Sequence, residues 1–314
     1  MRDLLKKLFP GAEREVAPDP EVPQDVRVSR PVFVVGCGRS GTAFLFELLK
    51  PFPELAATTG HPDGEDHVGW MQHGGAVIAG LATPQGDSGH LGYHFCPHMD
   101  ESDLGDGVQD AMHRHYAVSV LRGDLSRRVL NKCPHLSNKL RYVRAIFPDA
   151  TFLHIVREPV AVVASWVKVM QAYPQLQLYW PEAEYPCFWV LPAKDAAARG
   201  RVVAREPRFF PGGGVSAMAE YWSAVNANIS RQLADTPEQM LTVRYEDLLA
   251  RPDEELRKIA RFCDFRIPPT RRPEIKTGRN VLYRDQLSDE DVATIRLRTQ
   301  RVAKSFGYGR TRAP

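Results

Sequence analysis

The stretch PVFVVGCGRSGTAFLFELL, residues 31–49, decides the fold. Its first half holds an unbroken apolar run, Val32–Val35, which predicts a short strand buried on both faces. Three glycines follow, and residues 42–49 then carry apolar side chains at helical spacing. A strand, a glycine-rich turn and a helix start form a cradle for an anion, because the backbone approaches closely and its N–H groups point at the bound charge. The stretch therefore predicts a site for a phosphorylated ligand.

The glycine spacing alone does not identify that ligand. The three glycines fit the dinucleotide-binding turn G-x-G-x-x-G, but a lone match of this kind is weak. The turn also begins like a nucleotide-triphosphate P-loop, which needs Lys and then Ser or Thr after its last glycine. Thr42 and Ala43 stand there instead, so the phosphate-binding lysine and the magnesium-binding hydroxyl are both missing. A kinase or ATPase is therefore disfavoured, and the cradle encloses a cation, Arg39.

Length and composition are those of an ordinary globular protein. The 314 residues are 43% hydrophobic and 25% charged, which fits one large α/β domain or two small ones. A net charge of +3 is too small to predict a nucleic-acid partner, and no apolar run is long enough to span a bilayer. Five scattered cysteines without a CxxC pair indicate a reducing cytoplasm rather than a disulfide framework.

A second turn of the same kind follows further along the chain. A short strand is predicted to end at Lys132, and a helix capped by Ser137 comes after it. The next strand, Thr151–Val156, leads directly to Arg157, and Ser165 lies two turns into the following helix. A cation at a strand tip and a helix hydroxyl can hold a second phosphate group, since arginine offers a planar fork of donors.

An acidic loop follows the strand predicted at Leu55–Thr59. Ligands of doubly wound sheets lie beyond the carboxyl ends of the strands, so we expect residues 60–67 to overhang the cradle. This loop contains Gly64-Glu65-Asp66. A carboxylate beside a bound anion has its pKa raised by burial and like charge. The alternative is a solvated acidic turn.

Gly38-Arg39-Ser40-Gly41-Thr42 behind an apolar strand resembles the 5′-phosphosulfate loop of sulfotransferases that use 3′-phosphoadenosine 5′-phosphosulfate (PAPS). It is most similar to the bacterial and tyrosylprotein-type branch, whose loop carries arginine. The resemblance covers about residues 31–67, 129–170 and 215–265. It implies a three-layer α/β fold of the P-loop type, with a central parallel sheet of about five strands and helices on both faces.

The resemblance assigns the cofactor to both turns. Backbone N–H groups of residues 39–43 and Thr42 would hold the 5′-phosphate, while Arg157 and Ser165, at the family's spacing, would hold the 3′-phosphate. Tyr245 would lie near the adenine, and the basic run 271–279 would close over the 3′-phosphate. The implied cofactor-binding residues are Gly38, Arg39, Ser40, Gly41, Thr42, Ala43, Arg157, Ser165, Tyr245, Lys276 and Arg279.

The resemblance also implies the catalytic groups. Arg39 and Lys132 would neutralise charge on the sulfuryl oxygens, which makes a metal ion unnecessary. Asp66 or Glu65 would take the proton of the acceptor, because Gly64-Glu65-Asp66 matches the Gly-Glu-Glu of the family, although it lies several residues further from the loop. His61 or His67 would be the substitutes for that base.

The chain divides into three parts by this interpretation. Residues 1–30 form a basic amphipathic helix and an extended arm, 31–270 the sulfotransferase domain, and 271–314 a basic loop and a final helix capped at Ser288-Asp-Glu-Asp291. The domain carries insertions at about 68–128 and 171–214, the second aromatic and irregular, which we expect on the acceptor side. Contact of residues 1–9 with a membrane surface is a secondary hypothesis, and oligomeric state is not predicted.

The first insertion is rich in histidine. His90, His94 and His98 recur every four residues and could hold zinc on one helix face, but Gly89, Gly92 and Pro97 argue against a continuous helix. We therefore expect a substrate-facing, partly helical segment and no metal.

The predicted enzyme is thus a cytoplasmic, PAPS-dependent sulfotransferase. It would transfer a sulfuryl group to a hydroxyl or amine of a small-molecule, lipid, glycan or peptide acceptor, which the sequence does not identify. Two alternatives stay open: an NAD(P)-dependent oxidoreductase that uses the G-x-G-x-x-G turn, and a non-catalytic nucleotide-binding module.

Overall fold

A computed structural model of the chain describes residues 18–58, 64–75, 98–172, 176–179, 187–190, 214–266 and 286–309. The helix predicted within residues 1–9 lies outside these ranges, as does the basic run that contains Lys276 and Arg279. The division of the chain into three parts stays a prediction.

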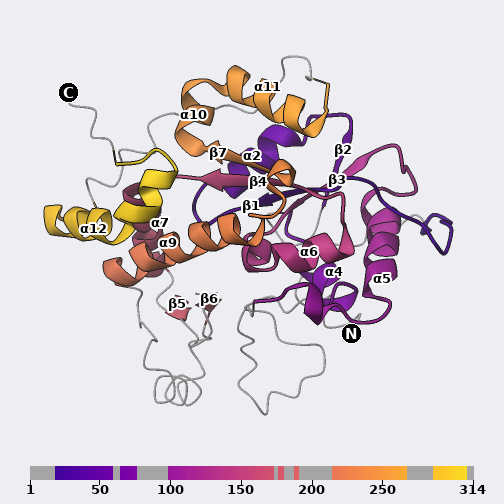
Figure 1. The fold of residues 1–314 in the computed structure, drawn as a ribbon, viewed down its shortest axis with the longest axis horizontal. Coiled ribbons are helices and arrows are strands. Elements are labelled where there is room, and N and C mark those ends of the chain that lie inside the picture. Colours follow the sequence, from indigo (N-terminus) through magenta and orange to yellow (C-terminus); the bar gives the residue numbers. More distant parts are fainter. Residues whose placement is uncertain are drawn as a thin grey trace, which may run out of the picture.

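The centre of the fold is a five-stranded sheet (Figure 1). Its strands are β1 (Val32–Val35), β2 (Leu55–Ala57), β3 (Arg128–Lys132), β4 (Thr151–Val156) and β7 (Met240–Arg244). They lie in the order β2-β3-β1-β4-β7, and every pairing is parallel. The predicted parallel sheet is confirmed. The order places β3 beside β1, whereas the dinucleotide-binding fold has its second strand there.

Helices cover both faces of this sheet, as predicted (Figure 1). One face carries α2 (Thr42–Leu49), α10 (Tyr245–Ala250) and α11 (Pro252–Cys263). The other carries α4 (His67–Gln72), α5 (Val108–His115), α6 (Leu140–Ile146), α7 (Pro159–Ala172), α9 (Val215–Gln232) and α12 (Asp289–Ser305).

The alternation of side chains along each strand explains the two cores. In β4, Leu153 and Ile155 pack with α2 and α11, while Phe152 faces α6. Neighbouring residues of β1 divide in the same way. Because successive side chains of a strand point to opposite faces, a fully apolar strand must be covered on both sides.

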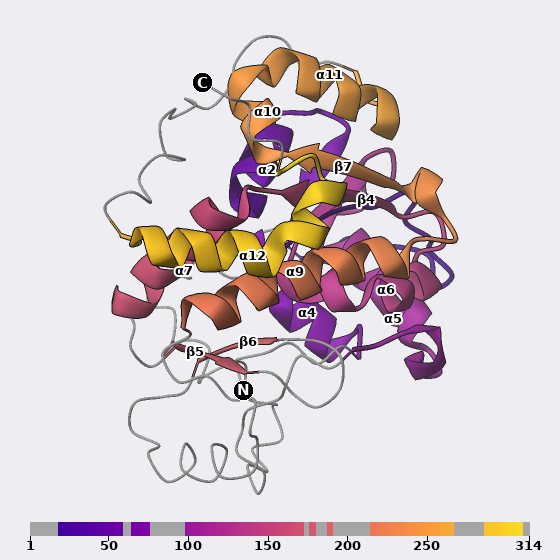
Figure 2. The same cartoon turned by 60° about the vertical axis from the view of Figure 1, so that its left-hand side comes forward.

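Helix boundaries are confirmed at one predicted position and corrected at another. Ser288 caps α12, with its hydroxyl accepting from Asp291 N and the Asp291 carboxylate accepting from Ser288 N. Figure 2 shows α12 lying across α7 and α9. The helix predicted to start at Ser137 begins instead at Leu140, after a 3₁₀ turn over Pro134–Asn138, because the Ser137 hydroxyl is engaged by the glycine-rich turn.

The described parts of both insertions are regular. The first contains α5 and, directly after it, a π-helix over Tyr116–Val120. In the second, which was predicted to be irregular, β5 (Leu176–Tyr179) and β6 (Cys187–Val190) form an antiparallel pair. No helix within the described ranges is both long and apolar enough to cross a membrane.

Candidate active site

Four strand ends meet at one edge of the sheet and carry predicted site residues. Gly36 follows β1, Lys132 ends β3, Arg157 follows β4, and Tyr245 follows β7. Because all these strands are parallel, their carboxyl ends lie at the same edge, where doubly wound sheets bind ligands. The topology therefore brings residues that are far apart in sequence to a common site.

The glycine-rich turn between β1 and α2 has a backbone that ordinary residues avoid. Gly41 has a φ of 98°, and a Cβ added there would lie 2.5 Å from Tyr245 Cδ2. Arg39 itself adopts a φ of 70°, in the left-handed region that costs a residue with a side chain roughly 1 kcal/mol or more. Such strain at the tip of a strand is typical of a binding site.

The turn also contains a buried hydroxyl group, that of Ser40, which a ligand could hydrogen-bond. Ser40 is fully buried, and its Oγ has no oxygen or nitrogen partner in the described chain, where only the weakly bonding Cys37 thiol interacts with it. Buried hydroxyls are normally satisfied. A phosphate oxygen against the turn would satisfy it, together with the N–H groups at the start of α2. The residues present therefore fit a phosphorylated cofactor.

Arg157 connects the second strand tip to this turn. The residue is 9% exposed, its Nη1 donates to Arg39 O at 3.3 Å, and its guanidinium lies 4.6 Å from the centre of the Tyr245 ring. Burial lowers the pKa of Arg157, and the neighbouring Tyr245 and Glu246 oppose that shift. Arg39 Nε in turn donates to Ser165 Oγ at 3.1 Å. Both predicted arginines thus lie in one cluster with Ser165.

The acidic loop reaches the same edge through Glu65. Its Oε1 lies 2.6 Å from Lys132 Nζ, and the loop is held by a 2.6 Å hydrogen bond from Thr58 Oγ1 to Gly64 O. Gly64 has a φ of 76°, and a Cβ there would lie 2.6 Å from the ring of Phe46. Glycine is therefore needed for the loop to lie against α2. Residues 64–66 lie at the same sheet edge as the cradle, while residues 60–63 lie outside the described ranges.

Asp66 has different neighbours from Glu65. It caps α4 by accepting from Gly69 N at 3.0 Å, and its Oδ2 lies 2.7 Å from His115 Nε2. The side chain of His67 and all of His61 lie outside the described residues, so their role as substitute bases stays a prediction.

No group of three metal-ligating side chains occurs in the described part of the chain. His90 and His94 lie outside it, while His98 Nδ1 contacts Asn138 O at 2.9 Å. The expectation that residues 90–98 bind no metal stays a prediction.

Two residues that support the site were missed in the sequence. Ser137 Oγ accepts from Gly36 N at 3.1 Å and lies 3.2 Å from Gly36 O, so it fixes the first residue of the turn. Tyr308 Oη lies 3.2 Å from Val156 O and 2.6 Å from Glu246 Oε2, and so supports the strand end before Arg157. The only sequence signal was the place of Ser137 shortly after the predicted strand end at Lys132.

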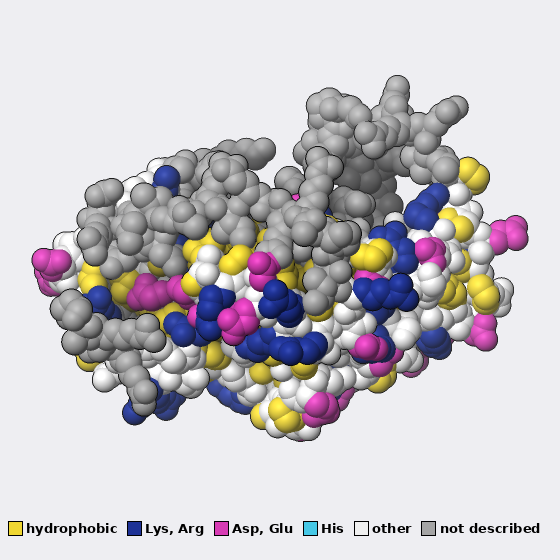
Figure 3. Space-filling model, turned by 90° about the horizontal axis from the view of Figure 1, so that it is seen from above, with side chains coloured by type: hydrophobic (Ala, Val, Ile, Leu, Met, Phe, Trp, Pro, Cys, Tyr) yellow, Lys and Arg dark blue, Asp and Glu magenta, His cyan; other side chains and the backbone are white. Residues whose placement is uncertain are grey.

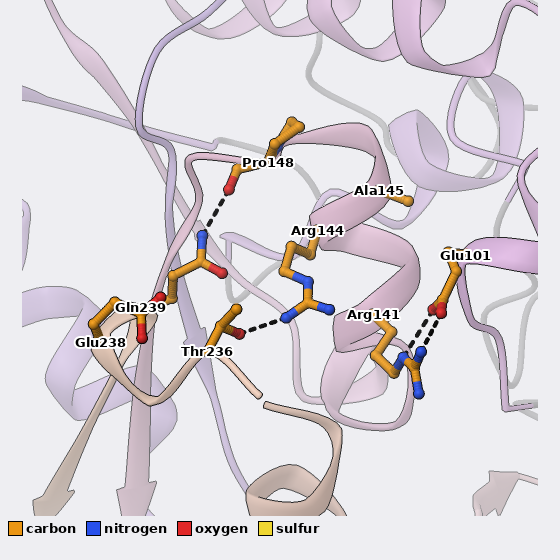
Figure 4. A pocket seen from close by; sticks show the side chains of 8 residues that line it. All are labelled: Glu101, Arg141, Arg144, Ala145, Pro148, Thr236, Glu238 and Gln239. Carbon is orange, nitrogen blue, oxygen red and sulfur yellow. Dashed lines mark hydrogen bonds and ion pairs between the residues drawn. The ribbon is translucent and has the colours of Figure 1, made fainter. Parts of the chain in front are cut away.

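A surface pocket of about 450 Å³ lies elsewhere (Figure 4). It contains Gln239, which directly precedes β7, and Pro148, three residues before β4, so it lies at the amino ends of the strands, opposite the cradle. Its Arg141 is paired with Glu101. Basic and acidic side chains are also mixed over the face seen in Figure 3. The pocket therefore lies apart from the cluster of Arg39, Arg157 and Lys132.

Comparison with known proteins agrees with this geometry. Residues 31–185 match the model of a family described as the sulfotransferase family. Nodulation protein NoeE of Sinorhizobium fredii is 23% identical over 235 residues, which cover 72% of this chain and 48% of NoeE. The chain thus spans about half the length of the curated relative that it matches.

The chain matches two solved structures, the first of which is similar in fold. The sulfotransferase domain from the olefin synthase of Synechococcus PCC 7002 has a TM-score of 0.52 at 18% identity, over 92% of this chain and 98% of that one. The sulfotransferase domain from the curacin biosynthetic pathway has a TM-score of 0.48 at 16% identity, over 90% and 99%.

Proposed function

Because the chain belongs to the sulfotransferase family, we propose that it is an enzyme that transfers the sulfuryl group of PAPS to a hydroxyl or amine. The observation that carries this proposal is the shared cluster at the sheet edge. Arg157 donates to the backbone of Arg39, Arg39 donates to Ser165, and Lys132 lies at the end of the neighbouring strand beside Glu65. These contacts support one cleft with cations for two phosphates and a carboxylate beside them.

The binding roles follow from the chemistry of each group. The N–H groups of residues 39–43 and Thr42 would hold the 5′-phosphate at the positive end of α2. Arg157 and Ser165 would hold the 3′-phosphate, since arginine presents two parallel donors to phosphate oxygens. The Tyr245 ring packs against the Arg157 guanidinium, and Tyr245 would lie near the adenine. Lys276 and Arg279 would close over the 3′-phosphate.

When bound, PAPS supplies an activated S–O bond whose leaving group is adenosine 3′,5′-bisphosphate. An acceptor oxygen or nitrogen that bonds to sulfur would displace this leaving group, and a carboxylate of this chain would take the acceptor proton. Lys132 and Arg39 would neutralise the charge that develops on the bridging and sulfuryl oxygens. As in phosphoryl transfer, the protein contributes mainly position and charge.

Glu65 is the better candidate for the base of the two carboxylates. Its Oε1 lies beside Lys132, the cation proposed to contact the sulfuryl group, whereas Asp66 caps α4 and contacts His115. We therefore assign proton abstraction to Glu65, with His61 and His67 as substitutes.

The order of the strands argues against a dinucleotide-dependent oxidoreductase, because β3 stands where that fold has its second strand. The acceptor stays a broad class: a small molecule, lipid, glycan or peptide. A reducing cytoplasm is the proposed compartment, consistent with the buried thiols of Cys37 and Cys263.

The test combines binding with turnover. Calorimetry with adenosine 3′,5′-bisphosphate, NAD and ATP should give binding only for the first. Mass spectrometry of a cell extract incubated with the protein and PAPS should then reveal a product heavier by one SO₃. Binding without any product would identify a nucleotide-binding module, and preferential binding of NAD would overturn the proposal.

A further inference from the structure

The Asp66 carboxylate joins two helices of the first insertion. Its Oδ1 accepts from Gly69 N at 3.0 Å, which caps α4, and its Oδ2 lies 2.7 Å from Nε2 of His115, the last residue of α5. Both side chains are nearly buried, at 11% and 12% exposure. A hydrogen bond to a carboxylate in such surroundings is strong, because water competes little for either group.

The surrounding residues are shaped for this contact. A Cβ at Gly69 would lie 2.2 Å from His115 Nε2, so only glycine leaves room for the imidazole at this point of α4. The ring of His73, at the end of α4, stacks on His115 with 4.8 Å between centres. Directly behind His115, the chain forms the π-helix, a rare turn found frequently at functional sites. The imidazole is thus fixed on several sides.

The consequence reaches the proposed base, because Glu65 precedes Asp66 directly. The backbone at Glu65 is held on one side by the bond from Thr58 Oγ1 to Gly64 O and on the other by Asp66. We propose that His115 is a positioning residue for the reaction: through Asp66 it fixes the backbone that aims Glu65 at Lys132 and the acceptor. This inference rests on the proposed function and gives His115 no contact with the reacting atoms.

Substitutions that differ only in the donor test the proposal. His115→Gln keeps an N–H donor near the position of Nε2, whereas His115→Phe keeps a ring and removes the donor. We expect His115→Phe to lower kcat for PAPS hydrolysis, with water as the probe acceptor, by about 10-fold or more, since small misplacements of a catalytic group are costly. KM for PAPS should be unchanged, and His115→Gln should restore most of kcat. His73→Phe, which keeps the stacked ring, is the matched control and should resemble the wild type.

A second readout does not depend on turnover. Hydrogen exchange followed by mass spectrometry should show faster exchange in a peptide covering residues 64–72 of His115→Phe, with α2 unchanged. If the Phe variant does not fold, His115→Asn replaces it, because the shorter amide places no donor at Nε2.

The outcomes separate the two proposals. Wild-type exchange in residues 64–72 of the donor-deleted variant would overturn the role of His115, and so would wild-type kcat. The proposed function would instead be refuted if the wild-type protein bound adenosine 3′,5′-bisphosphate but did not release it from PAPS with any acceptor, water included. A fall in melting temperature shared equally by His115→Phe and His115→Gln, without a difference in kcat, would show a merely structural role.

Discussion

Lys132 Nζ lies 2.6 Å from Glu65 Oε1, and this ion pair joins the end of β3 to the loop behind β2. The two side chains are only 2% and 13% exposed. A buried charge is tolerated only beside a compensating one, so Glu65 supplies the counter-charge of Lys132 in this structure. A sulfuryl group beside Lys132 would take over part of that role and release Glu65 to accept a proton.

Removing either partner of this pair should therefore affect turnover rather than nucleotide affinity. We expect Lys132→Met and Glu65→Gln each to lower kcat by about 10²-fold, the loss typical when one group that stabilises the transition state is removed. Adenosine 3′,5′-bisphosphate lacks the sulfuryl group, so its Kd should be unchanged in calorimetry. Lys50→Met, at an exposed lysine behind α2, is the control for loss of a positive charge. Equal losses of affinity in both variants would contradict the assignment.

Nucleotide binding should be weakened even by the conservative substitution of Arg157 with lysine. Its guanidinium both donates to Arg39 O and lies over the Tyr245 ring, and a lysine provides neither the planar fork nor the stacking surface. We expect Arg157→Lys to weaken binding of adenosine 3′,5′-bisphosphate about 10- to 100-fold, the effect of losing a charge-assisted pair of bonds. Arg251→Lys, at an exposed position, should bind like the wild type. Unchanged affinity in Arg157→Lys would remove this residue from the cofactor site.

Arg39 combines an unusual backbone with a side chain directed at Ser165. We expect Arg39→Ala to lower kcat by about 10²-fold or more, because a cation beside the transferring group is lost. Alanine at a φ of 70° is also strained, so the control must share that strain. Arg122→Ala is such a control, because Arg122 has a φ of 53° and would be strained in the same way. Its side chain is exposed and has no proposed role in the active site. A fall in kcat of the same size in both variants would mean that strain, rather than the lost cation, is responsible.

The turn itself can be tested with two glycines that differ in their surroundings. Gly41 and Gly107 both have positive φ, but an added Cβ would strike Tyr245 at the first and meet nothing within 4 Å at the second. Gly107→Ala should therefore cost about 1 kcal/mol of unfolding free energy from strain alone. Gly41→Ala should cost more and should also lose measurable binding of adenosine 3′,5′-bisphosphate, because Tyr245 must move beneath Arg157. Equal effects on stability and normal binding would show that the close approach is unimportant.

Local sequence was a reliable guide where one segment determines its own structure. The apolar runs of β1 and β4 predict buried strands with the observed bounds, since a strand covered on both faces needs apolar residues throughout. The pairing of β4 with β1 in the structure then places Arg157 beside the first turn.

Contacts between distant segments could not be predicted in the same way. Ser137 looks like a helix cap, and only its partner Gly36, on another strand, shows its actual role. His115 and Asp66 are 49 residues apart, and no local pattern connects them. The antiparallel pair β5–β6 lies in a segment whose prolines and aromatics indicate irregular structure, so cross-strand pairing outweighed local preference there.

A buried histidine of the central sheet should make stability depend on pH. His154, in β4, is completely buried, and its Nε2 lies 2.9 Å from Asn226 Oδ1. Burial, opposed by this hydrogen bond, lowers the pKa of His154 from 6.5 to about 4. Between these values the unfolded chain binds a proton that the folded protein excludes, so unfolding becomes easier as the pH falls. His154 should thus remove about 3 kcal/mol of stability between pH 7 and pH 4.

Urea denaturation at pH 7.0, 6.0 and 5.0 measures this loss of unfolding free energy. His154→Gln, which keeps a donor for Asn226 but does not titrate, should flatten the dependence of stability on pH. An equally steep loss of stability in that variant would assign the pH dependence to other groups.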